Sequence, residues 1–355
     1  MAASDPPLGL RTRASVSSQD RLLLAACRQQ VSDDDRRNIV EIASHASLDW
    51  PQLLQTAGTH GVAPLVFHNL TRIPEISALL PEDVLTRFRL LRLASEVRSG
   101  ELRRSLADVA GFCQERGIRV MAFKGAALDL LVYGQPWYTQ CADFDVILDC
   151  KREVMTPDDL GALHNLCVGG IEAEFFGHHD LTMSHVLPMS FDAIWKEARS
   201  LRVGAHEVWL MSDEDLLLSL CINSCRKRFF RLKSVCDIAE FLRVRGQPRW
   251  DMFAQKARER GCSGIAYAAL FASLIAVDAP VSPEALAVLD VNRAHAWTMR
   301  YLCGNLCFSS LAGTTRGVRI LRRTVAASLF LAYASHGLVG ACRRASVVLS
   351  GIGRN

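Results

Sequence analysis

The sequence predicts an α+β protein in which a small mixed β-sheet lies between N-terminal and C-terminal helical regions. Leucine and alanine clusters at helical spacing dominate the two ends of the chain, whereas short apolar runs that alternate with helical segments are confined to residues 117–210. The chain has 355 residues, half of them hydrophobic. It is therefore long enough to bury a substantial core in two or three domains.

Four segments are expected along the chain. Residues 1–18 combine Ser, Pro and Arg and are predicted to be disordered. Residues 19–116 form a helical region whose breaks are marked by prolines. Residues 117–210 hold the sheet, and residues 211–355 form a second helical region with a basic tail. The polar run Ser212–Asp215, directly before an apolar stretch, is typical of a capped helix start.

Short runs of apolar and β-branched residues predict the strands of the sheet. The expected strands are Val120–Phe123, Phe144–Leu148, Glu174–Phe176 and Leu181–Leu187. After Pro188 the pattern indicates helices again. The first two strands are joined by a glycine turn and a helix, so the sheet region should have an alternating order.

The second predicted strand is the most informative stretch, because it carries two carboxylates. Asp143 and Asp145 are separated by one residue, so on a strand both side chains leave the same face about 6.5–7 Å apart. Carboxylates held this close repel each other unless a cation lies between them. Their hard oxygen atoms suit Mg²⁺ or Mn²⁺, which usually arrive with a substrate's phosphates. Because an Asp-x-Asp pair at a strand edge is common, the surrounding pattern decides between a metal site and a structural pair.

The residues upstream supply that pattern. Lys124 precedes Asp143 by 19 residues, with one predicted helix between them. Gly125, between the first strand and this helix, leaves room for phosphate to approach backbone N–H groups, and Lys124 adds a positive charge. The stretch therefore predicts metal-assisted chemistry on a nucleotide.

A basic strip in the second helical region is another candidate for phosphate contact. Residues 226–233 contain five cations. Lys233 and Asp237 lie four residues apart and so share one face of a helix. Either the strip faces a triphosphate, with Lys233 neutralising its charge, or it is a solvated face with one local ion pair.

These motifs, in this order, resemble an uncharacterised bacterial nucleotidyltransferase family with a DNA polymerase β-like core. The matching stretches are Phe123–Ala127, Tyr133–Pro136, Asp143–Leu148, Met183–His185, Leu232–Leu242 and Trp250–Asp251. The resemblance implies transfer of a nucleoside monophosphate from a nucleoside triphosphate (NTP) to an acceptor. It also implies a site in which Mg²⁺ or Mn²⁺ is held by Asp143 and Asp145, and the nucleotide is contacted by Lys124, Gly125, Lys233 and Asp237.

The chain departs from the family pattern at three positions. Gln140 stands where the family usually has Arg, Met183 where it has a Glu, and Asn223 where His is common. The missing Glu is the third carboxylate of polymerase β-like enzymes, which helps to hold the metal and deprotonates the acceptor hydroxyl. Its loss predicts nucleotide binding with weak transfer, unless a neighbouring carboxylate replaces it. The candidates for that replacement are Asp180, Glu172 and Glu174.

The C-terminal tail is strongly basic. Nine arginines and no acidic residue follow Asp290, although the whole chain carries a net charge of only +4. Such a tail can contact RNA or lipid phosphates, or be a solvated helical face. Residues 324–342 lack charges and are flanked by arginine pairs. We interpret them as a buried helical hairpin, with peripheral membrane contact as the alternative.

The polar N-terminus and scattered cysteines favour a cytoplasmic protein with reduced thiols.

Three function classes remain open from the sequence. The first is a nucleotidyltransferase whose acceptor is a sugar, a peptide, a small molecule or RNA. The second is a catalytically weak nucleotide-binding or scaffold protein, which the changes at Met183 and Gln140 favour. The third is a metal-dependent glycosyltransferase, less favoured because no long nucleotide-binding βαβ region precedes the Asp-x-Asp pair.

Overall fold

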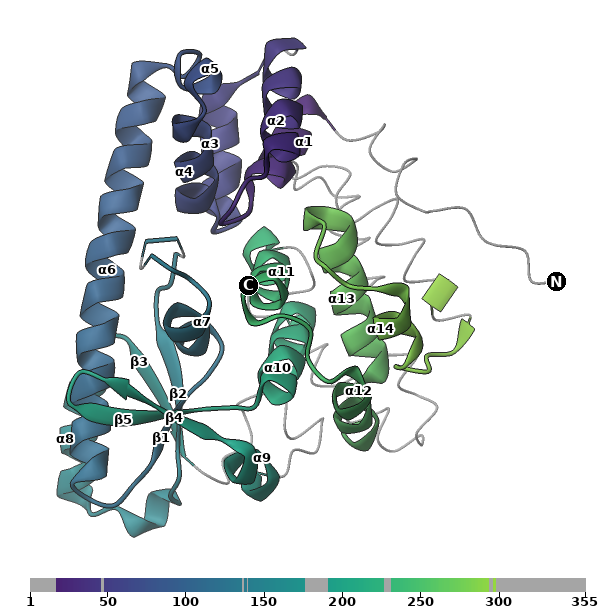
Figure 1. Cartoon of the computed structure of the whole chain (residues 1–355). Coiled ribbons are helices and arrows are strands. Elements are labelled where there is room, and N and C mark those ends of the chain that lie inside the picture. Colours follow the sequence, from purple (N-terminus) through teal and green to yellow (C-terminus); the bar gives the residue numbers. More distant parts are fainter. Residues whose placement is uncertain are drawn as a thin grey trace, which may run out of the picture.

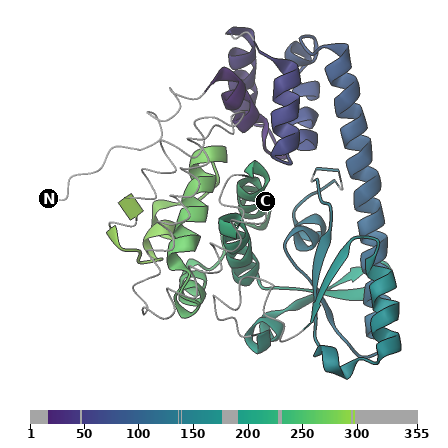
Figure 2. The same ribbon diagram turned by 180° about the vertical axis from the view of Figure 1, so that it is seen from behind.

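The computed structural model describes residues 17–45, 48–135, 137–138, 140–175, 191–226, 231–293 and 296–297. It confirms the predicted α+β class: one small mixed sheet is flanked by helices from both ends of the chain (Figures 1 and 2). The predicted strand Leu181–Leu187, the basic tail after Arg293 and the uncharged stretch 324–342 fall outside the described residues, apart from Ala296 and Trp297.

The sheet has five strands in the order β3-β2-β1-β5-β4. The strands are β1 Val120–Ala122, β2 Phe144–Leu148, β3 Ile171–Phe175, β4 Arg199–Val203 and β5 His206–Leu210. The central strand β1 runs antiparallel to β2 and parallel to β5, while β2 and β3 are parallel and β4 and β5 form an antiparallel hairpin. Parallel neighbours need a crossover, and the helix between β2 and β3 supplies it.

The prediction of helices directly after Pro188 is wrong in part, because β4 and β5 follow the short helix α9 (Phe191–Glu197). Gly204 has a positive φ of 63°, which places it in the tight turn that joins these two strands. Charged residues on the exposed face of β4 hide the strand alternation in the sequence. The third strand also begins at Ile171, three residues earlier than predicted.

In the described part of the chain, six helices precede the sheet. Their bounds are α1 Ser18–Ala26, α2 Asp33–His45, α3 Trp50–Thr59, α4 Ala63–Arg72, α5 Pro74–Ser77 and α6 Glu82–Gln114. The 33-residue α6 runs along the whole molecule (Figure 1), packing on α3 and α4 near its start and on the sheet near its end. Leu102, Leu106 and Val109 of α6 are fully buried against the sheet, at the i, i+4, i+7 spacing of one helical face. α6 therefore fixes the N-terminal helices relative to the sheet.

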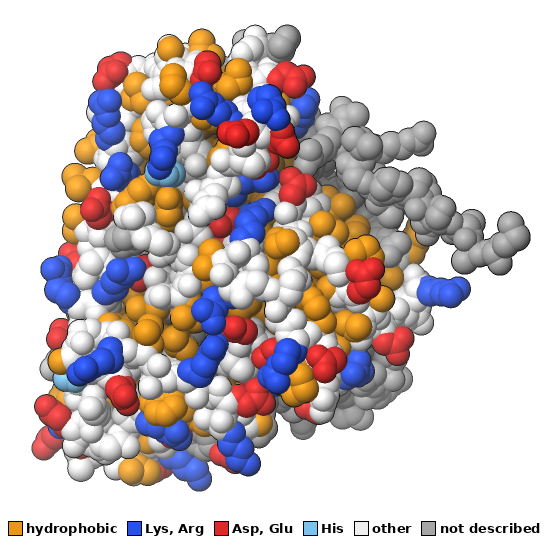
Figure 3. Space-filling model, in the orientation of Figure 1, with side chains coloured by type: hydrophobic (Ala, Val, Ile, Leu, Met, Phe, Trp, Pro, Cys, Tyr) orange, Lys and Arg blue, Asp and Glu red, His pale blue; other side chains and the backbone are white. Residues whose placement is uncertain are grey.

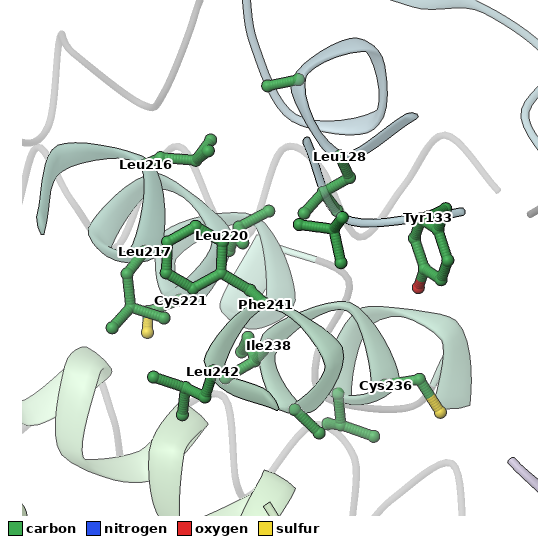
Figure 4. Close-up of a cluster of buried hydrophobic side chains, with 14 of the residues drawn as sticks. Leu128, Tyr133, Leu216, Leu217, Leu220, Cys221, Cys236, Ile238, Phe241 and Leu242 are labelled. Atoms are coloured by element: carbon green, nitrogen blue, oxygen red, sulfur yellow. The ribbon is translucent and has the colours of Figure 1, made fainter. Parts of the chain in front are cut away.

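Within and after the sheet lie α7 Gly125–Leu131, α8 Pro157–Cys167, α9, α10 Asp213–Arg226, α11 Leu232–Arg245, α12 Trp250–Glu259, α13 Ser263–Val277 and α14 Pro283–Ala287. A cluster of buried side chains joins α7 to α10 and α11, among them Leu128, Leu220 and Phe241 (Figure 4). This packing holds the C-terminal helices against the sheet region, beside the turn that follows β1.

None of the helices in the described part of the chain is long and apolar enough to cross a membrane. The eight cysteines whose side chains the structure describes are all free thiols, and Cys221 is buried as expected for a core residue.

Candidate active site

The two predicted carboxylates lie at the start of β2. Asp145 is on the strand and Asp143 directly precedes it. Val146, Ile147 and Leu148 continue into the core with no more than 1% of their surface exposed, as the sequence predicts. An apolar strand thus fixes the position of the backbone that carries the acidic pair.

Lys124 is the direct partner of this pair. Its Nζ lies 2.6 Å from Oδ1 of Asp145, and only 12% of the Lys124 side chain and 13% of the Asp145 side chain are exposed. The backbone N–H of Phe123 donates to the Asp145 carbonyl at 3.2 Å, which brings Lys124 alongside β2. Lys124 has φ 48° and ψ −121°, a conformation that a non-glycine residue rarely adopts. Such backbone strain is typical of functional turns.

Glu172 supplies a third carboxylate. In the parallel pairing of β2 and β3, Glu172 lies directly opposite Asp145 and therefore leaves the same face of the sheet. Its pKa is raised, first by partial burial and then by the charges of Asp143 and Asp145, while Lys124 opposes the shift. A hydrogen bond between Glu172 and Asp143 acts in the same direction. Three carboxylates and one ammonium group therefore face one another here.

The other two candidates for the third carboxylate differ from Glu172. Glu174 pairs with Ile147, two residues further along the strand and away from the acidic pair. Asp180 falls outside the described residues, as do Met183 and His185.

Arg98 of α6 holds the segments that lead into β2 and β3. Its guanidinium donates to the carbonyl of Ala142 at 3.1 and 2.5 Å and to the carbonyl of Gly169 at 3.0 Å. Gly170 has φ +105°, and a Cβ atom there would lie 2.1 Å from Nη2 of Arg98. Arg98 thus ties together the backbone beside Asp143 and the backbone before Glu172. The sequence carries no signal for this role, because Arg98 is one of many arginines on a long helix.

The predicted phosphate turn at Gly125 is bordered by Cys141. A Cβ atom at Gly125 would lie 3.2 Å from Sγ of Cys141. The Cys141 thiol also raises the pKa of Lys233, so it lies near that ammonium group as well. The structure therefore brings the turn after β1 and the start of α11 to one place, as a shared role in nucleotide binding requires.

Lys233 and Asp237 form the ion pair that their spacing predicts. Nζ of Lys233 lies 2.8 Å from Oδ2 of Asp237, and 17% of the Lys233 side chain is exposed. Burial by itself lowers the pKa of Lys233, but the Asp237 carboxylate and the Cys141 thiol outweigh it, so the pKa is raised. Lys233 is thus mostly buried, and the local ion pair that both interpretations include is present. Residues 227–230 of the basic strip lie outside the described residues.

Tyr133 connects this ion pair to the sheet region. Its hydroxyl donates to Oδ1 of Asp237 at 2.5 Å, and the ring lies beside α11 in the buried cluster of Figure 4. Burial and the neighbouring Asp237 charge raise the pKa of Tyr133 well above its usual value, so the phenol keeps its proton. The N-terminal helices reach the same place, because the backbone N–H of Lys233 donates to the carbonyl of His60 at 3.1 Å.

The oxygen atoms at the start of β2 and β3 fit a hard divalent cation, because three carboxylates face one another there and repel. In the described part of the chain, no three His, Cys, Asp or Glu side chains already converge as a metal-binding group. Among these carboxylates, Asp145 forms an ion pair with Lys124, and Asp143 is hydrogen-bonded to Glu172. Binding a cation would require these side chains to rotate away from their protein partners.

At Gln140, where an Arg was expected from the resemblance, the amide oxygen is buried and has no hydrogen-bond partner among the described residues. We find no structural role for this oxygen.

A strand that begins with two carboxylates, a lysine-glycine turn and a flanking helical domain define a nucleotidyltransferase-like protein. The chain belongs to the uncharacterised nucleotidyltransferase family, whose model matches residues 46–154 and 174–273, more than half of the chain. Glu172 lies in the interval between the two matched segments.

One solved structure is similar to this chain, a crystal structure of an antigenic nucleotidyltransferase-like protein from Paracoccidioides brasiliensis. The two are 17% identical with a TM-score of 0.31, over 41% of this chain and 77% of that one. This likeness is too weak to support an argument about the site. Comparison with the curated proteins gives no match.

Proposed function

We propose that the protein is a metal-dependent nucleotidyltransferase that moves a nucleoside monophosphate from an NTP to an acceptor. The observation that supports this most directly is the pairing of Glu172 with Asp145, next to Asp143. With Glu172 in place, the site has the three carboxylates that this chemistry needs, although Met183 stands at the family's usual position.

In the proposed reaction Asp143, Asp145 and Glu172 would hold Mg²⁺ or Mn²⁺ together with the triphosphate. The bound metal would supply charge neutralisation for the phosphates and the leaving group. Lys124 exchanges its contact with Asp145 for the phosphates, and Lys233 adds a second positive charge from α11. Catalysis of phosphoryl transfer depends mainly on such positioning and electrostatics.

Glu172 also receives the acceptor's proton in this proposal. The acceptor oxygen forms a bond to the α-phosphorus, the bond from that phosphorus to pyrophosphate breaks, and the hydroxyl proton moves to the Glu172 carboxylate. Glu172 is suited to this role by its position, because it lies opposite Asp145 and is hydrogen-bonded to Asp143. A scaffold protein without turnover is the second candidate, because Asp145 already forms an ion pair with Lys124 and this contact competes with metal binding.

The test of the proposed function is metal-dependent nucleotide binding by the Asp143→Asn, Asp145→Asn double variant. We expect calorimetry to show NTP binding by the wild type in the presence of Mg²⁺ and its loss in the double variant. Both substitutions keep the side-chain shape, so circular dichroism should show an intact fold. Unchanged metal-dependent binding in the double variant would rule out the assigned metal site.

The raised pKa of Glu172 predicts a pH dependence of metal binding. Metal ligands must be deprotonated, so protons compete with the cation up to a higher pH than at an ordinary glutamate. Mn²⁺ affinity should rise as the pH increases from about 4 towards about 7. The apoprotein should lose a little stability over the same range, because its folded state binds the Glu172 proton more tightly than the unfolded chain does. Calorimetric Mn²⁺ titrations should show a flatter pH dependence in Glu172→Gln, and an equally steep one would contradict the assignment.

A further inference from the structure

A second group of polar and positive side chains lies where the N-terminal helices meet the segment before β2. His68 and Arg72 come from α4, Arg92 from α6, and Trp137 and Tyr138 from the loop that follows α7. We call these five residues the arginine–aromatic cluster. Nε2 of His68 lies 3.2 Å from Nη1 of Arg72 and 3.3 Å from the Tyr138 hydroxyl. The guanidinium carbon of Arg92 lies 4.5 Å from the centre of the Trp137 ring.

No carboxylate of the described residues forms an ion pair with the arginines of this cluster. Among the described residues neither Arg72 nor Arg92 forms an ion pair with a carboxylate, and both side chains are exposed. By contrast, three other arginines of α6 are paired: Arg89 with Glu82, Arg98 with Glu101 and Arg103 with Asp129. Positive side chains are spaced along the α6 edge of the molecule in Figure 3.

The neighbouring groups do not cancel this charge. Burial, followed by Arg72 and Arg92, lowers the pKa of His68 to about 4, so the imidazole is neutral near pH 7. The carboxylate that acts on Tyr138 is Glu240, which already accepts from Arg243 at 2.5 Å and from Gln29 at 3.1 Å. Two guanidinium groups therefore remain to attract an anion.

The chemistry of the cluster suits a phosphate ester. Guanidinium groups match phosphate oxygens with several N–H donors. Trp137 is 5% exposed, with Arg92 over its ring and His68 4.9 Å from its centre, so it fixes the position of Arg92. The half-buried ring of Tyr138 lies at the edge of the cluster, where an unstacked base can contact it.

The cluster is linked to the carboxylates through α6. Arg92 and Arg98 are six residues apart on α6, about 9 Å along the helix axis. Arg98 donates to the carbonyl of Ala142, the residue before Asp143. Arg98 thus connects the helix that carries Arg92 to the segment that carries the acidic pair, and this link is the basis for assigning the cluster to the acceptor.

We propose that the arginine–aromatic cluster binds a phosphate ester of the acceptor, which places the acceptor among phosphorylated compounds such as the end of an RNA strand. The role as acceptor site rests on the proposed function. The binding of a phosphate ester does not, because it is measured without turnover. RNA and small phosphate monoesters share this chemistry, and the experiment separates them.

The test is the binding of a fluorescein-labelled single-stranded RNA octamer to the full chain, followed by anisotropy, with adenosine monophosphate as competitor. The Arg72→Gln, Arg92→Gln double variant should bind at least about tenfold more weakly than the wild type. Loss of two phosphate contacts should also weaken the salt dependence of binding. The negative slope of log K against log salt should become shallower by about 1.4. Arg89→Gln is the matched control, because Arg89 is an exposed α6 arginine paired with Glu82.

The outcomes separate this inference from the proposed function. Loss of RNA binding in the double variant but not in Arg89→Gln, with unchanged NTP binding, supports the cluster. Effective competition by adenosine monophosphate supports a small phosphorylated acceptor at the same cluster. Unaffected RNA and monophosphate binding overturns the proposal, and so does an equal loss of NTP binding, which would assign the cluster to the donor. If instead the wild type binds no NTP, the proposed function fails and not the cluster.

Discussion

Replacement of Glu172 by glutamine should lower the rate of nucleotidyl transfer by about 10²–10⁴-fold, the usual cost of losing general-base help. The loss should be larger if Glu172 is also a metal ligand. Glutamine keeps the size of the side chain, but it carries no charge and cannot act as a general base. The rate is measured as the Mg²⁺-dependent release of pyrophosphate in the presence of whichever probe, RNA or phosphate monoester, the binding experiment favours.

Two comparisons make this result specific. Glu174→Gln alters the other carboxylate of β3, which pairs with Ile147, and should leave the rate nearly unchanged. Thermal unfolding should show that apo Glu172→Gln is no less stable than the wild type, because the change relieves repulsion with Asp143 and Asp145. If Glu174→Gln stops transfer while Glu172→Gln does not, the third carboxylate is elsewhere on the strand.

The acidic strand could be predicted because its information is local. A short apolar run after an Asp-x-Asp pair identifies β2 and the face of its carboxylates from a few residues alone. The ion pair of Lys233 and Asp237 is local as well, since helical spacing brings residues four apart together. Such features need no knowledge of which strand lies beside which.

Glu172 could only be named as one of three candidates, because its place depends on register. A shift of one residue between β2 and β3 would move Glu172 to the other face of the sheet, and no nearby motif fixes that register. The predicted strand began at Glu174, which left Glu172 outside it. The β4–β5 hairpin was missed because its exposed charges mask the alternation.

Contacts between distant segments were also beyond the sequence. Arg98 lies 44 residues from Ala142, and His68 lies 70 residues from Tyr138. Each belongs to a helix whose pattern shows only which face is buried. The packing of α6 and α4 against the loop before β2 makes these residues part of the site, and that packing is a property of the whole fold.

Asp237→Ala should destabilise the fold by about 3–5 kcal/mol, the usual cost of removing one partner from a buried ion pair. Asp237 is 6% exposed, and its two oxygens accept from Tyr133 and Lys233. Without the carboxylate, the Lys233 ammonium stays in a mostly buried position with no opposite charge. Urea unfolding followed by circular dichroism measures the loss.

The double variant Lys233→Met, Asp237→Leu separates stability from function. Removing both charges leaves no uncompensated ion, so the double variant should recover more than half of the stability lost in Asp237→Ala. If Lys233 contacts the triphosphate, this stably folded variant should still bind NTP at least about tenfold more weakly than the wild type, because a phosphate contact is gone. Wild-type NTP affinity in a folded double variant would show instead that Lys233 and Asp237 only join α11 to the N-terminal helices and the sheet.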